Sequence, residues 1–254
     1  MKNLNILILS SLLIIIGFSS CKDDDVPPPI DPIVETIDLT FKFNALFKGN
    51  ALVFNNDYIT NANDTIRFDK IKYIFSNFEL VNNEDKIVPI ANQYAYISFS
   101  ENRKEVTFKN IPKGNYKTIR INVGLDSIVN FGNPAQYALD HPLSPSLTDM
   151  HWGWAGGYIF NVVEGYYKNN GQNAGFTFHI ATLKYKRTHT FVTDLNLTKN
   201  SSIYFNINAD KYFSNAINYS LKTDGAMSHS GNSDPIMDKY IQNVNGTIEF
   251  DKYE

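Results

Sequence analysis

The chain has 254 residues, of which 43% are hydrophobic and 19% charged, and its formal net charge is -3. This balance gives no basic surface for nucleic acid, so we exclude that class of partner. Cys21 is the only cysteine, which excludes an internal disulfide, a thiolate metal site and a cysteine nucleophile.

Residues 1–20 have the organisation of a secretory signal peptide. One lysine precedes an apolar run from Ile6 to Ile16, and small residues follow it. The run is well short of the ~20 residues that a membrane-spanning helix requires. Phe18-Ser19-Ser20-Cys21 resembles a bacterial lipobox, in which the cysteine is acylated and becomes the mature N-terminus. We therefore expect a lipid anchor on Cys21.

Residues 21–35 are expected to be a lipid-anchored linker. Lys22-Asp23-Asp24-Asp25 resembles the acidic tag that directs some lipoproteins of the Bacteroidetes type to the outer face of the outer membrane. The proline-dense segment 26–32 is typical of a semi-rigid, extended spacer. We expect a surface-exposed protein that contacts the outer membrane through its lipid only, with a folded domain over residues 36–254.

Alternation of hydrophobic residues dominates this domain and predicts strands along its length. We expect strands near residues 37–43, 71–75, 94–99, 116–123, 158–167, 175–183, 188–197, 202–209 and 247–250. Helical signals are confined to residues 133–139 and 234–241. The pattern predicts an all-β fold, an antiparallel β-sandwich with long loops and one or two short helices.

The longest stretch without strand pattern runs from Leu125 to Trp154 and ends in Met150-His151-Trp152-Gly153-Trp154. A loop of this length in a compact domain is functional or disordered, and two tryptophans argue against disorder. An extended backbone would place Met150, Trp152 and Trp154 on one face. The two indoles are expected either to pack in the core or to form an exposed platform that stacks on sugar rings.

His179 is expected to face away from its apolar neighbours Phe176 and Phe178. The hairpin that joins its strand to the preceding one makes Glu164 a direct or diagonal neighbour of His179. A carboxylate that orients an imidazole is typical of a metal ligand's surroundings, and a surface Glu–His pair is the alternative. Glu164 also lies on an apolar face and needs a partner, for which Arg120 and the histidines are the candidates.

Soft and borderline ligands recur near the histidines. Met150 adjoins His151, and Met227 lies two residues before His229. Thioether and imidazole ligands together favour copper over magnesium or calcium. No GxSxG, HExxH or paired-carboxylate motif is present, so we expect no enzyme activity.

Three stretches together resemble the methanobactin-associated copper-binding protein family, MbnP-like. They are residues 38–81 with "KYIFSNFEL", residues 139–167 with "HPLSP", "MHWGW" and "GYIF", and residues 175–180, "GFTFHI". The resemblance implies a secreted or lipid-anchored β-sandwich that binds one copper ion through histidines. It also implies, for some members, a tryptophan that a di-haem partner enzyme related to the MauG peroxidases oxidises to kynurenine.

Carried over by position, the family's tryptophan motif falls on Trp152 and Trp154, its HPL histidine on His141 and its strand histidine on His179. Many members carry a further histidine in the first strand, where this chain has Phe43-Asn44-Ala45. Either His151 or His229 replaces that ligand, or the site is lost.

From these patterns we predict a non-catalytic, cell-surface copper-binding lipoprotein that serves metal capture or homeostasis. The candidate ligands are His141, His151, His179 and His229, with Met150, Trp152, Trp154 and Glu164 as modified or supporting residues. The alternative is a surface adhesion or glycan-binding module that uses Trp152 and Trp154 as its platform.

Overall fold

A computed structural model describes residues 34–90, 93–153 and 156–254. Val34–Glu254 form one compact unit. The expected signal peptide, the lipidation site Cys21, most of the linker and Trp154 lie outside the described residues. Across the ranges that are described, no helix has the length and apolar character needed to cross a membrane.

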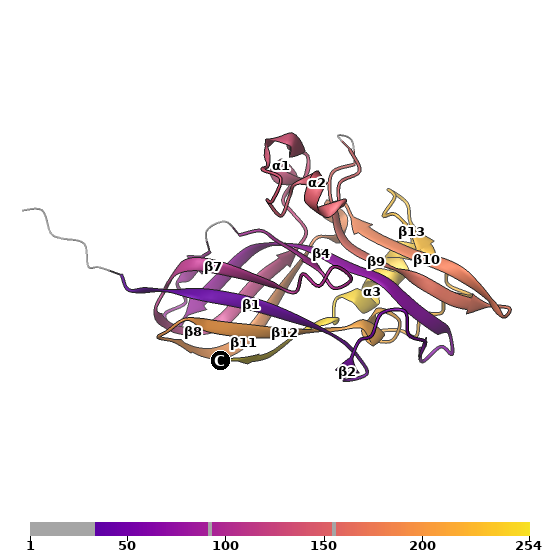
Figure 1. Ribbon diagram of the computed structural model, residues 1–254, viewed down its shortest axis with the longest axis horizontal. Helices are drawn as coiled ribbons and strands as arrows, with labels where there is room; N and C mark the ends of the chain where they lie inside the picture. Colours follow the sequence, from indigo (N-terminus) through magenta and orange to yellow (C-terminus); the bar gives the residue numbers. More distant parts are fainter. Residues whose placement is uncertain (1–33, 91–92, 154–155) are drawn as a thin grey trace, which may run out of the picture. The chain divides into compact units, whose positions relative to one another are not determined.

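Two sheets build the unit (Figure 1). The smaller sheet has the order β14-β12-β1-β2, with β7 also paired to β1. Its strands are β1 (Thr36–Phe47), β2 (Asn50–Ala51), β7 (Glu105–Pro112), β12 (Ser201–Asn208) and β14 (Ile248–Tyr253).

The larger sheet has the order β11-β8-β4-β9-β10-β13, and three further short strands pair with β4. Its strands are β3 (Tyr58–Ile59), β4 (Thr65–Asn82), β5 (Ile87–Pro89), β6 (Ala95–Ser98), β8 (Gly114–Val123), β9 (Ile159–Asn169), β10 (Gln172–Ala181), β11 (Arg187–Leu197) and β13 (Met227–Ser228).

The helices are short. They are α1 (Ser127–Asn130), α2 (Pro145–Thr148) and α3 (Pro235–Val244), with the 3-10 turns η1 (Pro134–Gln136), η2 (Leu183–Tyr185) and η3 (Ala209–Tyr212).

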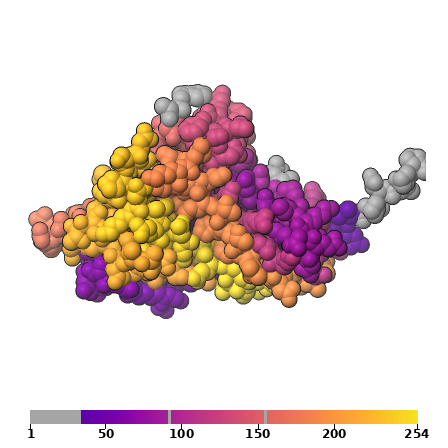
Figure 2. Space-filling view, turned by 180° about the vertical axis from the view of Figure 1, so that it is seen from behind, coloured from indigo at the N-terminus to yellow at the C-terminus, as the bar shows by residue number. Residues whose placement is uncertain are grey.

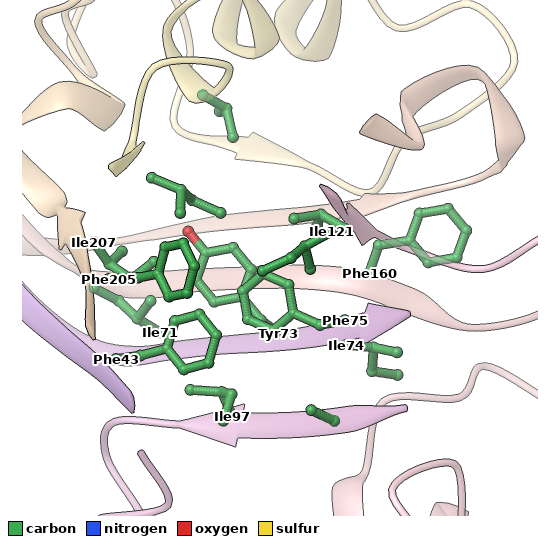
Figure 3. Packing of buried hydrophobic residues seen from close by; sticks show 14 of the residues in the cluster. Phe43, Ile71, Tyr73, Ile74, Phe75, Ile97, Ile121, Phe160, Phe205 and Ile207 are labelled. Carbon is green, nitrogen blue, oxygen red and sulfur yellow. The ribbon is translucent and has the colours of Figure 1, made fainter. Parts of the chain in front are cut away.

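Aromatic and branched side chains from both sheets meet in one core. Phe43 of β1 stacks on Phe75 of β4 with ring centroids 4.8 Å apart, and it also stacks on Phe205 of β12 at 5.5 Å. Figure 3 shows these rings with Tyr73 and Ile121 between the strands. The predicted β-sandwich is confirmed, because alternate residues of β1 and β12 are buried against the apolar residues of the larger sheet.

Two features of the topology differ from the prediction. β1 pairs with β12, and β10 pairs with β13, in parallel. The expected helix over 133–139 contains only the turn η1, which Asn133 caps by accepting the amide N–H of Ala135. Leu139 remains 75% exposed, so this segment gains no burial to offset the cost of helix nucleation.

The helix predicted at 234–241 is confirmed as α3, which begins after the cap Asp234. Its Tyr240 stacks on Phe178 of β10 with ring centroids 3.7 Å apart. From behind, the yellow C-terminal segments lie beside the orange strands that precede them in the chain (Figure 2). α3 therefore covers the apolar face of β10 and leaves the opposite face to His179.

Candidate metal centre

A tight hairpin sets the register between β9 and β10. Asn170 and Gly171 have positive φ angles of 51° and 82°, as the two central residues of a type I′ turn require. Asn169 consequently pairs with Gln172, and seven pairs further along the ladder Val162 faces His179. Any slip of one residue would turn His179 into the core.

The predicted contact between Glu164 and His179 is confirmed as a diagonal one. Glu164 pairs directly with Thr177, and its Oε1 lies 2.7 Å from Nε2 of His179. Both side chains are half-buried, with 20% and 15% of their surface exposed. The carboxylate therefore holds the Nε2 proton, and Nδ1 of the ring keeps its lone pair.

His229 reaches the same place from β13. Met227 pairs with Thr177 in parallel, which places His229 beside His179. The two Nδ1 atoms are 3.0 Å apart. The Ser230 hydroxyl fixes this approach, because it accepts the amide N–H of Ala181 and donates to the His179 carbonyl at 2.8 Å.

Trp152 lies next to the histidine pair. Its ring centroid is 6.1 Å from that of His179 and 6.3 Å from that of His229. The side chain is 40% exposed, so core packing does not account for this indole. We call His179, His229, Glu164 and Trp152 the histidine-pair site.

The prediction that Met150 and Trp152 share one face is wrong. Met150 is fully buried in the core, so its thioether supplies no ligand to the histidine-pair site. The backbone departs from an extended path on both sides, since Asp149 has a φ of 49° and Gly153 a φ of 92°. Residues 150–152 are therefore not part of a longer extended strand in which simple alternation would hold.

His141 and His151 are placed differently, each folded onto its own loop. Nδ1 of His141 accepts the amide N–H of Leu143 at 3.0 Å, and Nδ1 of His151 accepts that of Gly153 at 2.9 Å. Their rings pack on tyrosines, His141 against Tyr137 and His151 against Tyr158. Among the described contacts, neither ring touches another histidine, so the structure does not join these two candidates to the pair.

Lys70 of β4 is the partner of Glu164 that the sequence reasoning missed. Its Nζ lies 2.9 Å from Oε2 of Glu164, directly across the β4–β9 ladder. The expected partner Arg120 instead contacts Glu79 at 3.6 Å. The spacing gave no signal for Lys70, because β4 and β9 lie far apart in the sequence and only their pairing brings the two residues together.

The electrostatics keep the carboxylate charged and the second imidazole neutral. The hydrogen bond from His179, with help from Lys70, lowers the pKa of Glu164 to about 2. Burial lowers the pKa of His229, and His179 lowers it further. Near neutral pH His229 is therefore an uncharged imidazole, the form that binds a metal ion.

His179 and His229 supply two of the ligands that a metal ion would need. With nitrogen–metal bonds of about 2.0 Å, two atoms 3.0 Å apart subtend an angle of about 95° at one shared ion. No group of three His, Cys, Asp or Glu side chains suited to a metal occurs in the described ranges. Two imidazole nitrogens suit copper or zinc better than magnesium or calcium, and an angle near 95° leaves the other positions around such an ion to further ligands.

Comparison with known proteins places the chain. The model of the protein family described as MbnP matches residues 36–231, which include the whole histidine-pair site. The solved structure "MbnP from Methylosinus trichosporium" is similar with a TM-score of 0.55 and 16% sequence identity, over 80% of this chain and 86% of that one. At this identity the likeness shows a common fold alone. No match was found among curated proteins.

Proposed function

The chain belongs to the MbnP family, and on that premise we propose that it is a non-catalytic protein that binds one copper ion at the histidine-pair site. Its role is metal capture or homeostasis. The observation that carries the proposal is the approach of the two Nδ1 atoms to 3.0 Å beside a carboxylate that orients one of the rings. A carboxylate in this position raises the basicity of the imidazole that it holds.

The two rings have different starting states. Because Glu164 takes the Nε2 proton of His179, its Nδ1 faces His229 as an acceptor, and His229 must donate its own Nδ1 proton in the metal-free protein. Copper binding would require His229 to carry its proton on Nε2 instead of Nδ1. The Nδ1 atoms of His179 and His229 would then hold the ion, with the Trp152 ring beside both imidazoles.

Copper titration of the domain from residue 26 onward tests the proposal. We expect one Cu(I) per chain in the wild type and a loss of at least a hundredfold in affinity for His179→Ala, because one of two imidazoles is removed. A stoichiometry near zero, or an affinity that His179→Ala leaves unchanged, would sink the proposal. Trp152 fluorescence that responds to oligosaccharide and ignores copper would instead support the glycan-binding alternative.

Oxidation of a tryptophan to kynurenine by a di-haem partner related to the MauG peroxidases is part of the proposal. Trp152 is the candidate that the described residues support, because it is exposed and lies beside both histidines. Co-expression with a di-haem peroxidase related to MauG, followed by intact-mass analysis, is the measurement. A mass gain that persists in Trp152→Phe would move the modification to another residue, with Trp154 the first to consider.

Attachment to the outer face of the outer membrane through lipid on Cys21 completes the proposal. It rests on the lipobox-like and acidic segments of the sequence. We expect Cys21→Ser to release the protein from the membrane fraction and to remove its surface accessibility to protease in whole cells. A variant that stays in the membrane would contradict the anchor.

A further inference from the structure

Glu164 divides its carboxylate between two partners from two neighbouring strands. Oε1 lies 2.7 Å from Nε2 of His179 on β10, and Oε2 lies 2.9 Å from Nζ of Lys70 on β4. Lys70 and Glu164 are paired in register, so the backbone holds the ammonium against the carboxylate. Gly165 permits this close pairing, because a Cβ there would lie 1.9 Å from the carbonyl oxygen of Arg67 on β4.

The result is a continuous polar chain across four strands. It runs from Lys70 on β4 through Glu164 on β9 and His179 on β10 to His229 beside β13. The exposed fraction of the side chains falls from 40% at Lys70 to 20% at Glu164 and 15% at His179. Because Glu164 and His179 are partly shielded from water, the charge of Lys70 acts through Glu164 on the His179 ring.

The charge of Lys70 opposes that of Glu164. A carboxylate bound to a ligand imidazole donates electron density to the metal, which favours the ion of higher charge. The ammonium of Lys70 attracts electron density from the other oxygen of the same carboxylate and so weakens this donation. The charge of the neighbouring Lys72 is already compensated, because its Nζ lies 2.7 Å from Glu101 and 2.9 Å from Asp149.

We propose that Lys70 determines the oxidation-state specificity of the histidine-pair site, favouring Cu(I) over Cu(II) by offsetting the carboxylate of Glu164. This inference rests on the proposed copper function. Lys70 is a positioning and charge-compensating residue, not a ligand. Its effect is expected in the ratio of the two affinities, because the divalent ion carries one more positive charge than Cu(I).

The test compares Lys70→Met with a matched control. Methionine keeps most of the stem and removes the charge. Lys117→Met makes the same change at a lysine that is also 40% exposed and pairs with Asp85 at 2.8 Å, but it lies on β8 and away from Glu164. Lys70→Arg keeps the charge. Cu(I) and Cu(II) affinities of each metal-free protein are measured by competition with chelators of known strength.

For Lys70→Met we expect the ratio of Cu(II) to Cu(I) affinity to rise about tenfold, a shift that shrinks as salt is added. Lys70→Arg and Lys117→Met should stay within about twofold of the wild type. A purely structural role would lower both affinities alike, so an unchanged ratio in Lys70→Met overturns the inference, as does an equal rise in Lys117→Met.

The two proposals fail in different ways. If the wild type binds neither ion, the copper function is wrong and the inference falls with it. If the wild type binds copper and only the ratio in Lys70→Met fails to move, the copper function stands and the role of Lys70 alone is wrong. Nitrogen NMR of the metal-free variant checks the site, because the Nε2 proton of His179 should persist while Glu164 is in place.

Discussion

The two pairs of candidate histidines differ in what their Nδ1 atoms contact. In His141 and His151, Nδ1 accepts the amide N–H of the residue two positions later. In His179 and His229, the Nδ1 atoms face each other across neighbouring strands. The loop histidines are thus occupied by their own backbone, whereas the Nδ1 atoms of the strand histidines contact each other.

This difference shows how local hydrogen bonding competes with ligand assembly. A side chain that bonds to its own loop stabilises a turn at little entropic cost, and it then offers only its other nitrogen. A side chain on a strand has no such local partner, because its own backbone groups belong to the sheet. Histidines on paired strands are therefore the better candidates for a shared ion in this fold.

The largest expected effect is on copper affinity in double variants. We expect His179→Ala with His229→Ala to abolish measurable binding, and His141→Ala with His151→Ala to change the affinity by about threefold or less, since only the first pair converges on one point. Competition titration with Cu(I) chelators is the measurement. Equal losses in the two double variants would remove the distinction between the pairs.

A pH titration extends the comparison to the fifth histidine. Burial, together with the charge of the nearby Arg187, lowers the pKa of His189 to about 4. The unfolded chain takes up this proton near pH 6.5 while the folded chain does not, so the stabilisation is complete above pH 6.5 and is lost as the pH falls towards 4. The loss amounts to up to about 3 kcal/mol.

Urea unfolding at a series of pH values measures this loss. His189→Gln should flatten the decline between pH 6.5 and 4.5, a range above most of the carboxylate titration. His229→Gln is the control, because its imidazole is largely exposed and a smaller change is expected. A decline that His189→Gln leaves intact would assign the loss to other groups, of which His141 and His151 also have pKa values lowered by burial.

The next effect concerns the orientation of His179. Replacing Glu164 with glutamine keeps a hydrogen-bond acceptor but removes the charge, and we expect Cu(I) affinity to fall about tenfold. Glu79→Gln makes the same change in the same sheet, where Arg120 is the partner, and it should leave the affinity unchanged. A similar loss of affinity in both variants would show a general electrostatic effect of removing a carboxylate, and not an effect of the contact with His179.

The smallest expected effect is on stability, where we expect the loop histidine His151 to contribute more than the strand histidine His229. His151→Ala removes the bond to the amide of Gly153 and the packing against Tyr158, so we expect the free energy of unfolding to fall by about 1 kcal/mol. His229→Ala should change it by less than about 0.5 kcal/mol. Urea unfolding of the metal-free proteins checks this. A larger loss for His229→Ala would make that residue part of the structural framework.

Much of the fold could be predicted from the sequence, because strand and turn signals are local. The alternation in β9 and β10 and the short connection between them were sufficient to predict a hairpin that brings Glu164 next to His179. The helix α3 was predicted equally well from its aspartate cap and the proline that follows it. Each of these signals depends on residues within a few positions of one another.

Failures arose where the outcome depended on distant segments or on a single unusual backbone angle. Lys70 pairs with Glu164 only because β4 and β9 are neighbours in the sheet. His229 reaches His179 through a two-residue parallel strand, which is too short to produce a periodic pattern. Asp149, immediately before the buried Met150, adopts a positive φ that its residue type permits but does not require.

The sequence by itself determined the all-β class, the hairpin and the set of histidines, since periodicity and turn chemistry act over a few residues. Only the tertiary structure decided which histidines meet. The strand order brings His179 and His229 into contact. His141 and His151 instead bond to the backbone of their own loops. That choice is an outcome of packing across the whole sheet, and spacing along the chain does not encode it.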